Sequence, residues 1–302
     1  EQILYHRVMN TIEVFETGKV VQVPGSWSEM TPEQVRGVFR IFERCLRRGE
    51  SPLDFNVRVL WMLLGVRRTV KGWFADIFNG SSSVRDENVY RMCETFLGFL
   101  FSEESAALTF DSVANPMPVV RSGLVRLYGP GDLLQDLTFG EFRHASAAVN
   151  RFFKNHDIAD LDECIAFLYR VRSRKANRAG RMVPDVDQRN ARRHIHRASR
   201  LKGWQKNLVM MWFSACLKYL QTGVLEVDGE EIDLSRLFAG DESHSGVSFG
   251  WNDLLVEVAK ENTLGNIDRV DEEPLFSVLS IMWHNYKERK RNEQIIKASK
   301  AH

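Results

Sequence analysis

Cations are concentrated in one stretch of the chain, between Arg170 and Lys206. This basic stretch contains thirteen Lys or Arg residues and two acids, Asp185 and Asp187, so its formal charge is +11. The whole chain of 302 residues carries +1, and the remainder therefore sums to −10. Such an asymmetry is typical of a segment that meets negative charge. The residues that we expect to contact a partner are Arg174, Lys175, Arg178, Arg181, Arg189, Arg193, Arg197, Arg200 and Lys202.

The spacing of the arginines after Pro184 predicts a charged helical face. Arg189, Arg193, Arg197 and Arg200 lie three or four residues apart, so a helix would place them on one side. Like charges at this spacing repel by roughly 0.2–0.5 kcal/mol per pair. The face is therefore more stable with an anion than alone, and phosphate groups are one class of anion that it would neutralise.

The other interpretation is that these arginines pair with the acids of the remaining chain, within one molecule or between subunits. The segment from Glu226 to Asp233 is an obvious counterpart, because most of its residues are acidic. Aromatic side chains, which single-stranded nucleic acid binders use for stacking, are scarce, since Trp204 is the only one in the basic stretch. We therefore favour protein contacts and keep DNA or RNA as the alternative.

No arrangement of residues typical of a catalytic centre is present. The chain has no nucleophile elbow, no phosphate-binding glycine loop and no dinucleotide fingerprint. His144 has Glu141 and Asp136 nearby, but we interpret it as a helix-surface residue. His194 and His196 are two residues apart, which places them on opposite sides of a helix, among arginines that repel a dication. We expect no catalytic, cofactor-binding or metal-binding residues.

The elements that position these residues are mainly helices with clear start and stop signals. Thr31-Pro32-Glu33-Gln34 combines an N-cap, a proline at the first helical position and the glutamine of a capping box. Apolar residues at helical spacing follow, and Gly49 ends the helix. Ser51-Pro52 begins a second helix, which ends at Gly65.

A similar pattern returns 107 residues later. Leu137–Phe142 repeats the cap of the first helix, and Asp160–Glu163 begins a second one. A further amphipathic helix follows each pair, over residues 84–101 and 203–221. We interpret this as the internal duplication of a helical unit, although two unrelated capped hairpins would give the same pattern by chance.

Short β-hairpins are expected beside the helical units. Residues 224–227 and 231–234 flank Asp228-Gly229, a dipeptide suited to a tight turn. Residues 19–23 and 119–127 are further strand candidates, just before each repeat. The predicted fold class is mainly α, with duplicated helical-hairpin units and short β-hairpins between them. The expected domains are two helical repeat units at 1–123 and 124–240, and a helical C-terminal segment with a charged tail at 241–302.

Cysteine usage and hydropathy indicate a soluble, intracellular protein. No apolar run reaches the roughly 18 residues that a membrane span requires. The N-terminus lacks the pattern of an export signal. The four cysteines lie in apolar helical patterns without the spacing of a zinc or redox motif, which indicates buried free thiols in a reducing cytoplasm. They are Cys45, Cys93, Cys164 and Cys216.

Two parts of the second half have a distinctive sequence. One is Leu137–Phe142 with a following helix that ends at Phe167–Arg170. The other is Gly250–Leu255, followed by Gly265–Asp268 and a helix that begins at Pro274. Together these parts resemble tail-module, tail-assembly-like proteins of phages and prophages from gut bacteria.

The resemblance implies a tail-assembly factor or tail-associated component. Such a protein binds other proteins of the phage-like particle, or itself, rather than turning over a substrate, and the resemblance carries over no catalytic residues. The predicted function is thus a non-enzymatic tail assembly or structural protein in the cytoplasm of a bacterial host or on the virion. The alternative is a nucleic-acid-binding protein that uses the basic segment 170–206.

Overall fold

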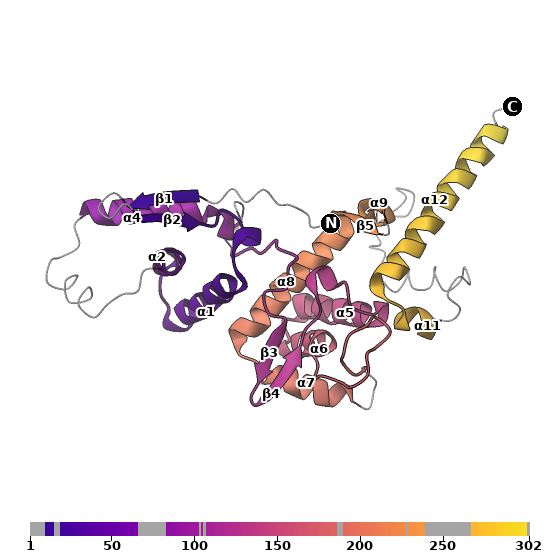
Figure 1. Ribbon diagram of the computed structural model, residues 1–302, viewed down its shortest axis with the longest axis horizontal. Helices are drawn as coiled ribbons and strands as arrows, with labels where there is room; N and C mark the ends of the chain where they lie inside the picture. The colour runs from indigo at the N-terminus through magenta and orange to yellow at the C-terminus, as the bar shows by residue number, and fades with distance from the viewer. Residues whose placement is uncertain are drawn as a thin grey trace. The chain divides into compact units, whose positions relative to one another are not determined.

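The computed structural model gives a mainly helical protein, as the sequence predicts. The described residues are 10–14, 19–65, 83–102, 104, 107–185, 190–227, 229–238 and 267–300. They form two compact units (Figure 1). Unit 1 comprises Glu1–Met117 and Lys202–Trp212, and unit 2 comprises Pro118–Leu201 and Phe213–His302.

The first boundary between the units differs in position from the expected one. It lies between Met117 and Pro118, whereas the sequence suggested a division after residue 123. Residue 123 is the first of the two turn residues of an antiparallel hairpin, in which Ser122 pairs with Val125. The hydrogen bonds of the hairpin hold both of its strands in unit 2.

Unit 1 begins with a β-hairpin and continues with helices. Its elements are β1 (Asn10–Val14), β2 (Lys19–Val23), the 3₁₀ turn η1 (Trp27–Glu29), α1 (Pro32–Arg48), α2 (Pro52–Leu63), α4 (Ser83–Leu97) and the 3₁₀ turn η2 (Gly98–Leu100). The first half of α8 (Gly203–Thr222) also clusters with this unit. Unit 1 is therefore made from two stretches of chain that are distant in sequence.

Unit 2 repeats this order and then extends it. Its elements are β3 (Val119–Ser122), β4 (Val125–Tyr128), the 3₁₀ turn η3 (Asp132–Leu134), α5 (Phe139–Asn155), α6 (Ile158–Leu168), α7 (Ala191–Ser199), the second half of α8, β5 (Val224–Val227), β6 (Glu230–Asp233), α9 (Leu234–Phe238), α11 (Ile267–Glu272) and α12 (Leu275–Lys300). Both units thus contain a β-hairpin, a 3₁₀ turn and a pair of helices in the same order.

The first helix of each pair starts with the same cap. Thr31 and Gln34 form a capping box at the start of α1, and Thr138 and Glu141 form one at the start of α5. Each box satisfies backbone donors that the first turn of a helix leaves without partners. Both helices are 17 residues long. The agreement in cap, length and order supports the predicted duplication.

The later elements agree with the sequence in kind and differ in some bounds. α6 begins at Ile158, two residues before the predicted start, because the carboxylate of Asp157 accepts a hydrogen bond from the backbone of Ala159 at 2.9 Å. β5 and β6 form the predicted hairpin, with Val227 opposite Glu230. The helix expected around residues 251–258 lies outside the described residues.

The C-terminal helix α12 is longer than its apolar face. It runs for 26 residues, and Leu275, Val278 and Leu279 are fully buried at its start. From Lys287 onwards nearly all of its described side chains are exposed or half-exposed, as the predicted charged tail requires. No helix within the described ranges has the length and hydrophobicity to cross a bilayer.

Aromatic side chains fill both cores. In unit 1 the ring of Trp27 lies 6.1 Å from that of Phe39 and 4.9 Å from that of Phe110. In unit 2 the ring of Phe142 lies 6.3 Å from that of Phe213. Burying each of these side chains stabilises its unit by roughly 1.5–3 kcal/mol.

The four cysteines are buried and free, as the sequence predicts. Burial, reinforced by a hydrogen bond to Glu50, raises the pKa of Cys45 to about 11. Burial also raises the pKa of Cys93, Cys164 and Cys216. All four thiols are therefore protonated at neutral pH, and we expect them to react with thiol reagents only after the chain unfolds.

The ends of α1 and α5 provide a matched test of the backbone. Both helices end at a left-handed residue, Gly49 with φ 63° and His156 with φ 56°. A side chain in this conformation costs about 1 kcal/mol. Gly49→Ala should therefore lower the free energy of unfolding by about that amount, and His156→Gly should raise it slightly. Urea denaturation followed by circular dichroism measures both changes. A loss of stability in both variants would contradict the left-handed backbone conformation of His156.

Candidate anion-binding surface

The fold distributes the basic stretch Arg170–Lys206 among three places. Residues 170–185 form a loop that follows α6, and residues 191–199 form α7. Lys202 immediately precedes α8. The three groups differ in burial and in partners, so each is described separately.

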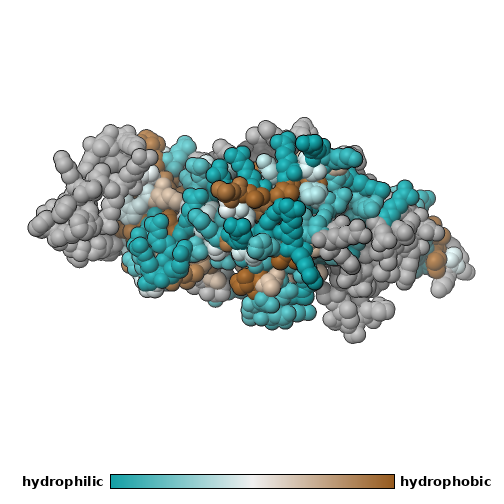
Figure 2. Space-filling model, turned by 90° about the horizontal axis from the view of Figure 1, so that it is seen from below, coloured by the Kyte–Doolittle hydropathy of each residue, from teal (hydrophilic) through white to brown (hydrophobic). Residues whose placement is uncertain are grey.

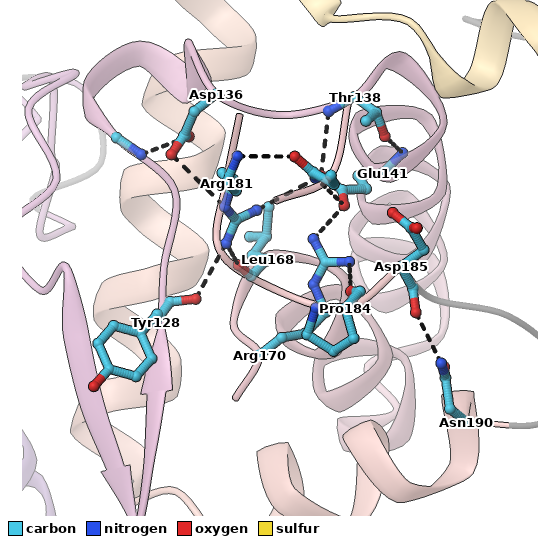
Figure 3. Close-up of polar contacts among 12 residues, drawn as sticks. Tyr128, Asp136, Thr138, Glu141, Leu168, Arg170, Arg181, Pro184, Asp185 and Asn190 are labelled. Atoms are coloured by element: carbon cyan, nitrogen blue, oxygen red, sulfur yellow. Dashed lines mark hydrogen bonds and ion pairs between the residues drawn. The ribbon is translucent and has the colours of Figure 1, made fainter. Parts of the chain in front are cut away.

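A buried glutamate, Glu141, holds the start of the loop (Figure 3). It is the third residue of α5, where its carboxylate accepts a hydrogen bond from the backbone of Thr138 at 3.2 Å. The fully buried guanidinium of Arg170 forms an ion pair with the same carboxylate and donates to the carbonyl oxygen of Pro184 at 2.7 Å. The amide of Asn177 donates to Glu141 at 3.2 Å. One carboxylate thus joins the start of α5 to two points of the loop.

Arg181 is the second cation at this carboxylate. Its guanidinium lies 3.6 Å from Glu141 and 3.7 Å from Asp136. It also donates to the carbonyl oxygens of Leu168 at 2.7 Å and Tyr128 at 3.1 Å. Burial lowers the pKa of Arg181, and the charge of Glu141 acts in the opposite direction. Because Arg181 is buried and bonded inside unit 2, we assign it to the fold, not to the predicted partner surface.

The other predicted cations of the loop are exposed. Arg178 pairs with Glu272 at 2.9 Å and with Glu273 at 3.2 Å, at the end of α11. Exposed pairs of this kind contribute roughly 0–1 kcal/mol. Arg174 and Lys175 are exposed and have no ion pair with the described acids. The loop is therefore bound mainly to its own unit.

Helix α7 carries the second group on its outer face. Arg193 and Arg200 are exposed and Arg197 is half-buried, while His194, between them in sequence, is buried. Burial and the charge of Arg193 lower the pKa of Arg197, so the two guanidinium groups repel each other. None of the three arginines forms an ion pair with a described acid. Arg189, predicted on the same face, lies outside the described residues.

The β3–β4 hairpin fixes the end of α7. The hydroxyl of Ser122 donates to the carbonyl oxygen of Arg197 at 2.6 Å. Gly123, in the turn of the hairpin, has φ 61°, and a Cβ atom there would lie 3.0 Å from the guanidinium of Arg200. The hairpin therefore anchors the backbone at Arg197 and lies against the side chain of Arg200. We call Arg193, Arg197 and Arg200 the α7 arginine surface.

Two arginines that the sequence reasoning missed lie on the same hairpin. Arg121 and Arg126 are direct cross-strand partners and are both exposed. Like charges in this position destabilise a hairpin slightly, so a bound anion would favour it. Their symmetric placement about the turn can be read from the sequence. That they lie directly opposite each other follows only from the register of the hairpin. Figure 2 views the side on which α7 and this hairpin lie, where hydrophilic side chains predominate in unit 2.

Lys202 is placed with the other unit. It is exposed, clusters with unit 1, and lines a cleft together with arginines of α1. The basic stretch is therefore continuous in sequence but not one site. The structure brings together Arg193, Arg197 and Arg200 and assigns Lys202 to a different group.

The histidines singled out in the sequence form no centre. His194 is buried and His196 exposed, on opposite sides of α7 as predicted. His144 stacks on Phe167 with 5.0 Å between ring centroids, and burial lowers its pKa. In the described part of the chain, no group of three His, Cys, Asp or Glu is placed to hold a metal ion.

Within the described ranges, no ion pair joins the acidic hairpin β5–β6, the counterpart that the sequence suggested, to the basic stretch. Asp233 accepts hydrogen bonds from Arg236 at 2.8 Å and from Ser235 at 2.5 Å, so its partners are local. Glu226 and Glu231 are exposed and lie opposite each other. Among the described residues, the acids that meet the basic stretch lie on α5, on the turn before it and at the end of α11. These acids meet the basic stretch because the packing of the helices brings them there, and not because acids are dense in that part of the sequence.

The α7 arginine surface has the chemistry of an anion site. Guanidinium groups bind carboxylate and phosphate oxygens through paired hydrogen bonds, and a helix anchored at its end presents them in a fixed arrangement. Comparison of the chain with models of protein families, with curated proteins and with solved structures finds no match. The kind of partner is therefore inferred from the chemistry of the surface itself.

The buried ion pairs predict a large effect of one conservative change. Glu141→Gln keeps a side chain able to complete the capping box, as Gln34 does in α1, but leaves Arg170 and Arg181 without their shared carboxylate. Removing one partner of a buried pair costs about 3–5 kcal/mol. We expect this loss in the free energy of unfolding from urea denaturation.

The control for Glu141→Gln is Glu163→Gln. Glu163 pairs with Arg151 at 2.6 Å, and both side chains are partly exposed. This control should cost less than about 1 kcal/mol. Equal losses in the two variants would show that the buried carboxylate does not hold unit 2 together.

Proposed function

We propose that this chain is a non-enzymatic assembly or structural protein that binds an acidic partner protein through the α7 arginine surface. The observation that carries the proposal is the placement of Arg193, Arg197 and Arg200. They are held along one helix, at least partly exposed, and have no ion pair with a described acid. Such a face gains most from a partner that supplies carboxylates at matching positions.

The way this chain uses arginine internally favours a protein partner. Arg170 meets Glu141, Arg178 meets Glu272 and Glu273, and Arg143 meets Asp271 at 2.5 Å. In each case an arginine joins two separate segments through a carboxylate. An acidic surface on a second copy, such as that of β5–β6, or on another protein would meet α7 by the same chemistry.

The context that we propose is the tail module of a phage-like particle, assembled in the cytoplasm of a bacterial host. The resemblance of residues 137–170 and 250–274 to tail-assembly-like proteins supports this context. The exposed end of α12 also supports it, because Ile295 and Ile296 are 57% and 52% exposed on a helix that is otherwise polar there. A helix that is polar nearly all round is favoured when it bridges to another body.

The second candidate function is binding of DNA or RNA by the same surface. It is favoured by the exposed arginines of the β3–β4 hairpin, since Arg121 and Arg126 add positive charge close to the turn that contacts Arg200. Binding to phosphates would weaken steeply as salt increases and would depend little on base sequence.

Charge reversal on α7 tests the proposed function. Arg193→Glu with Arg197→Glu should abolish association with the acidic partner, because attraction becomes repulsion at the centre of the surface. The measurement is affinity purification of the tagged chain from its native host after cross-linking, with quantification of every co-purifying protein. The matched control is Arg174→Glu with Lys175→Glu, which changes the same charge on the exposed loop. Circular dichroism confirms that both variants are folded.

The outcomes separate the two functions. A partner or second copy that is retained by the wild type and the control, and lost by the α7 variant, supports assembly. Fluorescence anisotropy with a DNA duplex and an RNA strand, at about 50 and about 200 mM salt, tests the second candidate. Tight, salt-sensitive binding that the α7 variant loses, with no co-purifying protein, would replace the first proposal by the second.

A further inference from the structure

Unit 1 contains a cleft whose lining shares no residue with the α7 arginine surface. It has a volume of about 370 Å³, within the range of small-ligand sites. Helix α1 supplies one wall and the start of α8 supplies the other. The lining residues are Arg40, Glu43, Arg44, Arg47, Arg48, Lys202 and Trp204.

The lining is strongly positive. It contains five cations and one carboxylate, that of Glu43. Glu43 is paired with Arg47 at 2.9 Å, and Arg48 lies 3.5 Å from Glu50 outside the lining. Arg40, Arg44 and Lys202 have no ion pair with a described acid. The cleft therefore holds positive charge that the described part of the chain does not neutralise.

The corresponding helix of unit 2 shows that this charge is not demanded by the fold. Arg151 stands at the same distance from the N-cap of α5 as Arg44 does from the N-cap of α1. Arg151 is neutralised by Asp160 at 2.8 Å and Glu163 at 2.6 Å. Arg44 lines the cleft together with Lys202 and has no ion pair with a described acid. The arginine at this position is neutralised by acids in unit 2, whereas in unit 1 it has no ion pair with a described acid.

Some side chains of the cleft have partners within the lining. The guanidinium of Arg40 lies over the indole ring of Trp204, 4.6 Å from its centroid. A Cβ atom at Gly203 would lie 2.6 Å from the carboxylate of Glu43, so this carboxylate lies directly against the start of α8. Arg40 is therefore placed by Trp204 and Arg47 by Glu43 before any ligand arrives, which lowers the entropic cost of binding at these two residues.

We propose that this cleft binds a small phosphate-bearing oligoanion, such as the phosphate chain of a nucleotide. Four arginines and a lysine offer paired donors and point charges that suit several phosphoryl oxygens at once. Trp204 is only 8% exposed and its ring carries Arg40, so it offers no free face to a base. The site thus recognises phosphates and not the nucleobase. This inference is independent of the proposed function, which rests on other residues.

The test is a calorimetric titration of the full chain with sodium tripolyphosphate at about 50 mM salt, repeated at about 200 mM salt. We expect saturable binding to one site, weaker at the higher salt. Arg44→Gln should weaken it about tenfold, since a charge-assisted contact is lost. Adding Lys202→Gln should weaken it further. Arg151→Gln, at the matching position of α5, should leave it unchanged.

A second variant is expected to change the affinity for tripolyphosphate in the opposite direction. Glu43→Gln removes the only carboxylate of the lining, so electrostatics predicts several-fold tighter binding of tripolyphosphate. A purely structural role for Glu43 would weaken binding instead. The melting temperature of each variant shows whether unit 1 is intact.

Two further ligands distinguish the source of the phosphate. ATP and an oligonucleotide with a 5′-terminal phosphate are each titrated under the same conditions. ATP that binds within about threefold of tripolyphosphate supports recognition of phosphates alone and assigns a nucleotide source. Competition by the oligonucleotide end, without binding of ATP, supports the phosphate site and assigns a polynucleotide source.

Three results would overturn the proposal. They are no binding of tripolyphosphate at the lower salt, equal binding by the wild type and Arg44→Gln, and loss of binding in the α7 variant but not in the cleft variants. The last result would attribute phosphate binding to α7. Failure of the cleft and failure of the proposed function are therefore distinguishable.

Discussion

In unit 2 the buried carboxylate of Glu141 joins several segments of the chain. Glu141 completes the cap of α5 and at the same time neutralises two buried arginines from the following loop. Through Arg181 this cluster reaches the carbonyl oxygens at the ends of β4 and α6. Burying charge is unfavourable unless the charge is paired, so the ion pairs of Arg170 and Arg181 with Glu141 favour one arrangement of the loop. The loop precedes α7 in the chain, and the β3–β4 hairpin fixes the end of that helix.

Burial, not residue type, decides what each arginine does. Arg170 and Arg181 are surrounded by carbonyl groups and a carboxylate, so they act as structural cross-links. Arg193 and Arg200 have the same side chain on an exposed helix face and are available to another molecule. The two repeat units show the same principle at the level of helices. The neutral Gln34 caps α1, whereas the charged Glu141 caps α5, and only the second attracts buried cations.

Local signals in the sequence predicted much of the fold. Caps such as Thr31 and Thr138 and stops such as Gly49 act within a few residues, so helix starts and ends could be assigned from them. The burial of Arg181 could not be predicted, because its partners come from β4, α6 and α5. Charge counting treated that residue as available, although tertiary packing had enclosed it.

The candidate sites were predictable to different degrees. The α7 face follows from helical spacing alone, and the structure places Arg193, Arg197 and Arg200 as that spacing requires. Only one wall of the cleft of unit 1 could be predicted from the sequence. Arg40, Arg44 and Arg48 recur at intervals of four along α1, but nothing local shows that Lys202 and Trp204 meet them. Contacts between segments so far apart in sequence arise only from the tertiary fold.

The discontinuity of unit 1 has a consequence for how the protein is made. Trp212 has 0% exposure, and its indole donates to the carbonyl oxygen of Val113 at 3.0 Å, so it belongs to the core formed with the first 117 residues. A ribosome delivers the chain from its N-terminus, and Trp212 emerges only after the hairpin, α5, α6 and α7 of unit 2. The core of unit 1 is therefore incomplete until residues 202–212 have been synthesised, after residues 118–201 of unit 2. We therefore expect unit 1 to complete its core only after Trp212 has been synthesised, and cutting the chain at the first boundary would leave unit 1 without part of its interior.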